Sequence, residues 1–173
     1  MQDIDTERYC VSLAKSRAPD MVLASLYTPP PCRDALMALC ALDAEFTHIR
    51  HAAREELIAH MRYAWWEDAL EQTYAGNPPA GHVVLQAWHD VGLPLAQERI
   101  LGLLHHHRSH YPQFSPEADE KLEAITHNII DVQPPQAQRG WHKARGIIRA
   151  HREKYGAGRN SWLYLKLLLG GIK

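Results

Sequence analysis

The chain has 173 residues, of which 46% are hydrophobic and 23% charged, so it is long enough to bury a substantial core and lacks the composition of a disordered protein. Its 19 basic and 20 acidic residues nearly balance, and the formal net charge of -1 offers no basic excess for binding nucleic acid. We expect one globular domain over residues 1–173 and no nucleic-acid partner.

Three cysteines, Cys10, Cys32 and Cys40, are too widely spaced for a metal or redox motif and predict reduced, partly buried thiols. The first residues are acidic and polar, unlike a signal or transit peptide. The most apolar run, over 162–169, is far shorter than the roughly 18 residues that span a bilayer. We expect a cytoplasmic protein, at most peripheral to a membrane.

Helical periodicity, interrupted by proline and glycine, predicts an all-α fold of about eight or nine helices without strands. In chain order the expected helices cover 9–15, 21–27, 31 through 49, 54–74, 83–91, 94–111, 117–131, 134–155 and 162–169. Pro19 is suited to the first turn of the second helix, and Pro31 to the first turn of the third.

Two of these helices carry distinct apolar patterns. In the third, apolar residues recur at steps of three and four and predict one face in the core: Leu36, Leu39, Leu42, Phe46 and Ile49. The apolar arc of the fourth is wider and predicts burial among several neighbours; it comprises Leu57, Ile58, Met61, Trp65 and Trp66. We expect both tryptophans in the core, with the lining of a lipid pocket as the alternative.

A series of short motifs extends along the first two thirds of the chain. They are Ala24-Ser25-Leu26-Tyr27, Arg33, Ala35-Leu36, Ala38-Leu39, Glu45, Ile49-Arg50, Arg62, Trp65-Trp66, Asp68-Ala69-Leu70 and Tyr74-Ala75-Gly76 with Pro78-Pro79. Their order resembles the squalene/phytoene synthase family, and more closely a divergent branch that includes a mitochondrial complex I assembly factor. The resemblance covers about 10–111, is weaker over 141–172, and implies a single, truncated helical domain of the isoprenoid-synthase kind.

The resemblance also indicates which chemistry is missing. Active members of the family hold Mg²⁺ with a first motif Asp-Asp-x-x-Asp, whose positions fall here at residues 47–51, Thr-His-Ile-Arg-His. Mg²⁺ requires hard oxygen ligands and is rarely held by imidazole. A second motif, Asp-x-x-x-Asp, does not occur in the sequence. We therefore expect no catalytic residue and no cofactor, with Mg²⁺ only if the protein is an enzyme after all.

Two functional hypotheses follow from this resemblance. The first is a non-catalytic binding or assembly protein whose apolar helical groove holds a protein partner or an isoprenoid or other lipid. The alternative is a prenyltransferase of isoprenoid biosynthesis, or a partial subunit of one, acting on a prenyl diphosphate. Pocket residues are predicted at Thr47, His48 and His51, the former metal positions, with Arg62 facing them from the next helix. Loss of central helices would uncover apolar faces, which predicts a homodimer or an obligate protein partner.

Other polar clusters have simpler interpretations. Glu45 and His48 have the Glu-x-x-His spacing of di-iron bundles, but no second copy exists, so a coincidental polar face is favoured. The histidine-rich segment 105–110 is expected to be a solvated helix end, although His106 or His107 can converge with His110 on an adventitious metal ion.

The charged helices offer similar alternatives. Glu67, Asp68 and Glu71 are expected to form a solvent-facing stripe rather than a set of catalytic acids. The basic helix over 139–154 is expected to present a solvated face, and binding to anionic lipid is the other possibility for it.

Overall fold

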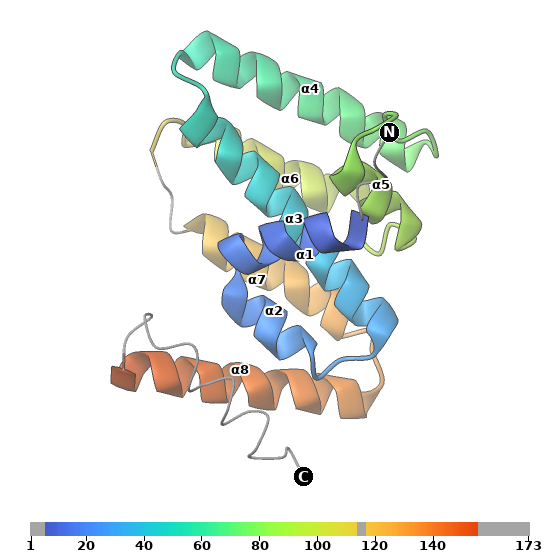
Figure 1. Ribbon diagram of the computed structural model, residues 1–173, viewed down its shortest axis with the longest axis vertical. Helices are drawn as coiled ribbons and strands as arrows, with labels where there is room; N and C mark the ends of the chain where they lie inside the picture. The colour runs from blue at the N-terminus through green and yellow to red at the C-terminus, as the bar shows by residue number, and fades with distance from the viewer. Residues whose placement is uncertain (1–5, 114–116, 156–173) are drawn as a thin grey trace.

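The computed structural model describes residues 6–113 and 117–155, and every regular element in these two ranges is a helix (Figure 1). The helices are α1 (Thr6–Arg17), α2 (Pro19–Ser25), α3 (Pro30–Ala52), α4 (Glu56–Tyr74), α5 (Val83–Asp90), α6 (Gln97–Ser109), α7 (Glu117–Ile130) and α8 (Pro135–Tyr155). The predicted all-α fold is confirmed, and most bounds agree within three residues. The expected helix over 162–169 lies outside the described ranges.

The long helix α3 runs through the middle of the molecule and packs against α1, α2, α4, α5, α6 and α7 (Figure 1). It begins one residue earlier than predicted, with Pro29 as its N-cap and Pro30 at its first position, where the missing N–H costs no hydrogen bond. The predicted apolar stripe is confirmed, because all five of its side chains are buried. Thus α3 is the axis of the hydrophobic core.

Helix α1 crosses in front of α3, and α2 leads from it towards α8 (Figure 1). Pro19 occupies the first turn of α2 as predicted, and the following residues from Met21 to Ser25 are all buried. These two short helices therefore cover one side of α3, which places α1 against the segment that carries the former metal positions.

Helix α4 lies at one edge of the molecule and packs on α6, α5 and α3 (Figure 1). Its buried face follows helical spacing and comprises Ala59, Tyr63, Trp66, Ala69, Leu70 and Thr73. The prediction that its whole apolar arc is buried was wrong. An edge helix can bury only the side that faces its neighbours, so Leu57 (68% exposed), Met61 (62%), Trp65 (45%) and Ile58 (39%) remain at the surface. Only the second of the two tryptophans is a core residue.

Helix α8 closes the opposite side of the molecule, against α2 and α7 (Figure 1). Trp141, Ala144 and Ile148 are buried, so the apolar side of this basic helix faces the core. That placement favours the solvated-face interpretation of the helix over one in which its apolar side enters a lipid surface. Gly140 lies directly against the turn that follows α2, where a Cβ atom would come within 2.9 Å of the carbonyl oxygen of Tyr27.

Candidate functional site

A cleft of about 430 Å³ lies between α1 and α3. Each helix contributes one face to it, because the lining residues of each recur roughly once per helical turn. They are Tyr9, Leu13, Ser16 and Arg17 from α1, and Ala44, Glu45, Thr47, His48 and His51 from α3. The cleft is therefore polar and mixed in charge.

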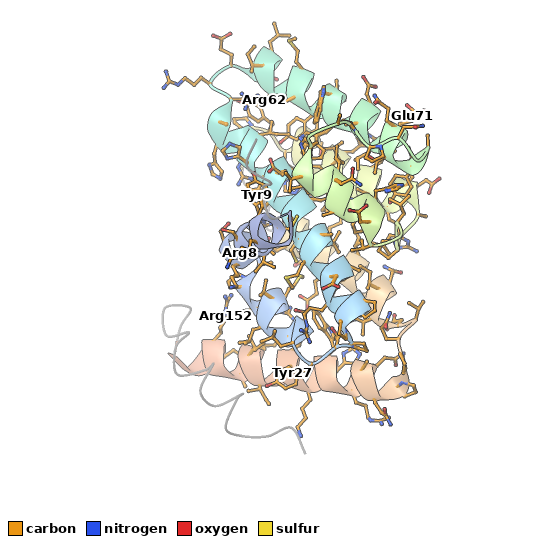
Figure 2. The ribbon with its side chains drawn as sticks, turned by 45° about the vertical axis from the view of Figure 1, so that its right-hand side comes forward. Arg8, Tyr9, Tyr27, Arg62, Glu71 and Arg152 are labelled. Carbon is orange, nitrogen blue, oxygen red and sulfur yellow. The ribbon has the colours of Figure 1, made fainter. Side chains whose placement is uncertain are left out.

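Three of the four predicted pocket residues, Thr47, His48 and His51, line this cleft together. The fourth, Arg62, does not. It is exposed on α4 at a distance from Tyr9 of α1, as Figure 2 shows, because it belongs to the outward side of that helix. The role of the three residues in binding stays a prediction.

Two hydrogen bonds join the walls of the cleft. The Tyr9 hydroxyl donates to Glu45 Oε1 at 3.2 Å, and Arg17 Nε donates to Thr47 Oγ1 at 3.1 Å. Partial burial raises the pKa of Tyr9, and the negative charge of Glu45 raises it further. Glu45, the glutamate of the Glu-x-x-His pattern, therefore accepts a hydrogen bond from Tyr9 across the cleft.

An ion-pair network that the sequence did not reveal lies beneath the cleft. Asp43 of α3 is fully buried, with Oδ2 at 2.6 Å from Arg17 Nε and Oδ1 at 2.7 Å from His107 Nε2 of α6. Arg17 also reaches Asp119 of α7, Nη2 to Oδ1 at 2.6 Å. These contacts join α1, α3, α6 and α7 through Arg17, which also lines the cleft.

The neighbours of Arg17 explain why its guanidinium stays positively charged. Burial by itself lowers the pKa of this guanidinium, but Asp43 and Asp119 outweigh burial and the pKa is raised. The Nε–H bond points at Thr47 Oγ1, so Asp43 Oδ2 is close to the positive charge but receives no well-directed hydrogen bond. Arg17 is a permanent cation held between two helices.

The histidine-rich segment is only partly the solvated helix end that was predicted. His107 is buried and points at Asp43, because it occupies the inward side of α6. His106 and His110 do converge, with ring centroids 4.3 Å apart, while exposed His105 contacts Glu67 of α4, Nε2 to Oε1 at 2.7 Å. The prediction that His107 can share a metal ion with His110 was wrong.

The acidic stripe of α4 is solvent-facing only in part. Asp68 and Glu71 are exposed, but Glu67 is half-buried and also receives a hydrogen bond from Arg108 Nη1 at 3.0 Å. Glu67 joins α4 to α6, and none of the three acids lines the cleft.

The residues of the cleft do not fit a magnesium cluster. Its lining offers one carboxylate, Glu45, whereas Mg²⁺ bound against a diphosphate requires several hard oxygen ligands. In the described part of the chain, the clusters of potential metal ligands lie elsewhere, at His106, His110 and Glu117 and at His127, Asp131 and His142. We therefore derive no reaction step through Mg²⁺.

A second cavity, of about 510 Å³, lies on the other side of α1, bordered by α2, α3 and α5. Its apolar lining comprises Cys10, Val11, Val22, Leu26, Met37, Ala38, Ala87 and Val91. Lys15 and Arg33 also border it, together with Asp34 and Asp90. Such a lining can accommodate an elongated apolar molecule with a polar head group.

Comparison of the sequence with known families identifies the family of this chain. The family model described as squalene/phytoene synthase matches residues 14–107, more than half of the chain, and the chain belongs to this family. The matched region ends in α6, so α7 and α8 lie beyond it.

The chain is also similar to curated relatives named NADH dehydrogenase (ubiquinone) complex I, assembly factor 6. Identity is 33% over 83 residues for the protein of Bos taurus, 31% over 83 for Homo sapiens and 32% over 80 for Mus musculus. These matches cover 46–48% of this chain and only 24–25% of each relative. No solved structure gives a significant match. None of the described helices is long and apolar enough to cross a membrane.

Proposed function

We propose that this chain is a non-catalytic member of the squalene/phytoene synthase family that binds a protein partner, in the manner of an assembly factor. The client we favour is a subunit of a multi-subunit respiratory or other membrane complex. The similarity to assembly factor 6 of complex I supports this proposal over the part of the chain that it covers.

The observation that carries the proposal is the composition of the α1–α3 cleft. Thr47, His48 and His51 stand at the positions where the resemblance would place metal-binding aspartates, and Glu45 is bonded to Tyr9. Ionising a prenyl diphosphate requires a metal cluster to neutralise the departing charge, a task that a hydroxyl and two imidazoles do not perform. Binding is therefore the function that these residues support best.

The exposed apolar face of α4 supplies a surface for such a partner. Leu57, Ile58, Met61 and Trp65 recur over three turns on the side of α4 that faces away from the core. Contiguous apolar surface of this kind is uncommon on monomeric soluble proteins and marks association sites. An apolar face of a partner helix is the complementary surface that we expect.

A catalytic assay separates this proposal from the prenyltransferase alternative. Purified protein is incubated with Mg²⁺ and farnesyl or geranylgeranyl diphosphate, and the release of pyrophosphate is measured. We expect no release above that of heat-denatured protein. Metal-dependent turnover would overturn the non-catalytic assignment and favour the enzyme, whether alone or as a subunit that borrows acids from another chain.

A binding assay tests the surface. The double variant Leu57→Ser, Met61→Ser is compared with Val132→Ser, since Val132 is equally apolar and 78% exposed but lies at the α7–α8 turn. Specific co-purifying subunits, quantified by mass spectrometry, should be lost from the α4 variant and retained by the control. Equal recovery of the same subunits by both variants would remove α4 from the proposal. Light scattering shows whether the partner is a second copy of this chain.

The apolar cavity beside α1 supports a lipid or isoprenoid ligand as a second candidate function. Ala87 borders this cavity and is half-buried, so Ala87→Phe should fill part of it, whereas Ala124→Phe adds the same ring at an exposed site on α7. Native mass spectrometry of protein mixed with farnesol should detect a complex with wild type and the control but not with Ala87→Phe. Equal binding by all three proteins would exclude this cavity.

A further inference from the structure

A polar stripe crosses the contact between α7 and α8. Glu123 and His127 of α7 and Asp131, the residue directly after this helix, follow one another at steps of four. They share one side, because the Asp131 N–H still donates to the His127 carbonyl oxygen as in a helix. From α8, Arg145 Nη2 lies 2.7 Å and Arg149 Nη2 lies 3.7 Å from Glu123 Oε1. The half of the stripe around Glu123 is therefore neutralised by two arginines.

The other half of the stripe is made of metal-ligand side chains. The rings of His127 and His142 lie nearly parallel, with centroids 5.6 Å apart, and Asp131 completes a group whose ligand atoms all fall within 4.8 Å of one another. In the described ranges the Asp131 carboxylate has no hydrogen-bond or ion-pair partner; only its backbone is engaged, by His127 and Gln138. Two imidazoles and a carboxylate thus gather at one place between α7 and α8.

We propose that His127, Asp131 and His142 bind one Zn²⁺ ion, which fastens α8 to α7. Imidazole nitrogen with one carboxylate oxygen is a ligand set that suits Zn²⁺, whereas Mg²⁺ and Ca²⁺ select all-oxygen sites. Three protein ligands leave the fourth tetrahedral position to water. The site is independent of the proposed function.

The three ligand atoms need to move only a short distance to bind one Zn²⁺ ion. Ligand atoms around tetrahedral Zn²⁺ lie about 3.3 Å apart, given metal–ligand bonds of roughly 2.0–2.1 Å. Asp131 and His142 are exposed and His127 is half-buried, so rotation of these side chains can bring the three atoms from within 4.8 Å to that spacing. The short turn between α7 and α8 keeps the two helices adjacent.

The second group of potential ligands, His106, His110 and Glu117, provides an internal comparison. Burial lowers the pKa of His106, and the neighbouring His110 and Lys121 lower it further. Lys121 is a fixed positive charge that opposes a bound metal ion at this place. The α7–α8 group is therefore the stronger metal site.

The test is a calorimetric titration of Zn²⁺ into the full chain without any polyhistidine tag. His142→Ala should lose one equivalent of Zn²⁺, or bind it roughly tenfold or more weakly. His110→Ala should leave that equivalent unchanged. Because His142 is exposed, its variant should fold like wild type in the absence of metal, which the melting temperature verifies.

Hydrogen exchange provides the second readout. Zn²⁺ should slow exchange of the α8 amides in wild type and in His110→Ala, and should not do so in His142→Ala or Asp131→Asn, because a ligand that binds only the folded state stabilises it. An unchanged stoichiometry in His142→Ala would overturn the proposal. So would Zn²⁺ binding that is lost only in His110→Ala, or binding that leaves α8 exchange unaltered.

Discussion

Asp43 of α3 and His107 of α6 are both buried and meet at 2.7 Å, Oδ1 to Nε2, although 64 residues separate them in the chain. Arg17 of α1 approaches the other carboxylate oxygen. A charged residue in an apolar interior requires such partners, because desolvation of an isolated carboxylate costs several kcal/mol. The three side chains thus specify how three helices meet.

Replacing Asp43 should destabilise the fold strongly. Asp43→Ala leaves the largely buried guanidinium of Arg17 without its principal counter-ion, and breaking a buried pair in this way costs about 3–5 kcal/mol. Urea unfolding followed by circular dichroism measures the loss. Asp119→Ala is the matched control, since Asp119 contacts the same Arg17 but is 56% exposed, and an exposed pair contributes about 0–1 kcal/mol. Equal losses would contradict the importance assigned to the buried pair.

The fold was accessible from the sequence because helical periodicity and proline placement are local signals. Leu36 through Ile49 repeat at the helical period, and Pro19 and Pro30 begin helices, so α2 and α3 were predictable from a few neighbouring residues each. The outward position of Trp65 could not be predicted in this way. The number of helices around α4 depends on tertiary packing, which the apolar pattern of α4 does not reveal.

The site was predictable only in part, for a related reason. Thr47, His48 and His51 share one face of a single helix, so their proximity follows from helix geometry, and the family resemblance indicated which face to examine. The Arg17–Asp43–His107 network joins three helices far apart in the chain. Its one local sign is an aspartate inside the apolar run of α3, which indicates a buried partner without identifying it.

The two adjacent tryptophans of α4 should differ sharply on truncation. Trp66 is 4% exposed and packs edge-on against Phe46, with centroids 5.1 Å apart, so Trp66→Ala should cost about 3–5 kcal/mol. Trp65 is 45% exposed, and Trp65→Ala should cost less than about 1 kcal/mol. Unfolding of the two variants in guanidinium chloride measures both losses of stability. Similar costs would indicate that α4 buries its other face as well, for instance in a dimer.

Two glycines of α8 should respond to alanine in opposite directions. Gly140→Ala introduces a Cβ atom 2.9 Å from the Tyr27 carbonyl oxygen, a backbone atom of the turn between α2 and α3, and overpacking of this kind costs about 1–3 kcal/mol. Gly146→Ala meets no atom within 4 Å and should stabilise the helix by up to about 1 kcal/mol. Thermal unfolding of both variants gives the signs. A neutral Gly140→Ala would mean that α8 does not pack on α2 this closely.

The free energy of unfolding should fall as the pH drops below the ordinary pKa of histidine, and His82 should contribute to this fall. Burial lowers the pKa of His82 below its ordinary value of 6.5, and its neutral Nδ1 accepts a hydrogen bond from the Leu85 N–H at the start of α5. Between the lowered pKa and 6.5 the unfolded chain binds a proton that the folded chain does not, so the free energy of unfolding falls as the pH falls across that window.

The variant His82→Asn isolates this contribution, because asparagine is a good N-cap but does not titrate. Urea unfolding at a series of pH values should show a shallower pH dependence for the variant below pH 6.5, and a stability close to that of wild type at about pH 8. Identical slopes for the two proteins would show that His82 does not titrate differently in the folded state.

The three cysteines should resist modification in the native state. Burial raises the pKa of Cys10 to about 11 and that of Cys40 to about 12, and Cys32 is raised as well. Since the thiolate is the reactive form, a disulfide reagent at about pH 8 should label the native protein slowly and the urea-unfolded protein rapidly. Fast labelling of one native cysteine would reveal local opening of its helix.

Because Arg17 belongs to the first helix, shorter versions of this polypeptide can lose it. A fragment beginning at Ala18 would retain Asp43, His107 and Asp119 but would have no cation from the first helix to meet them. Such a fragment would expose the long flank of α3 that α1 covers and leave a desolvated negative charge at its centre, so a protease cut after residue 17 should inactivate the molecule by unfolding it.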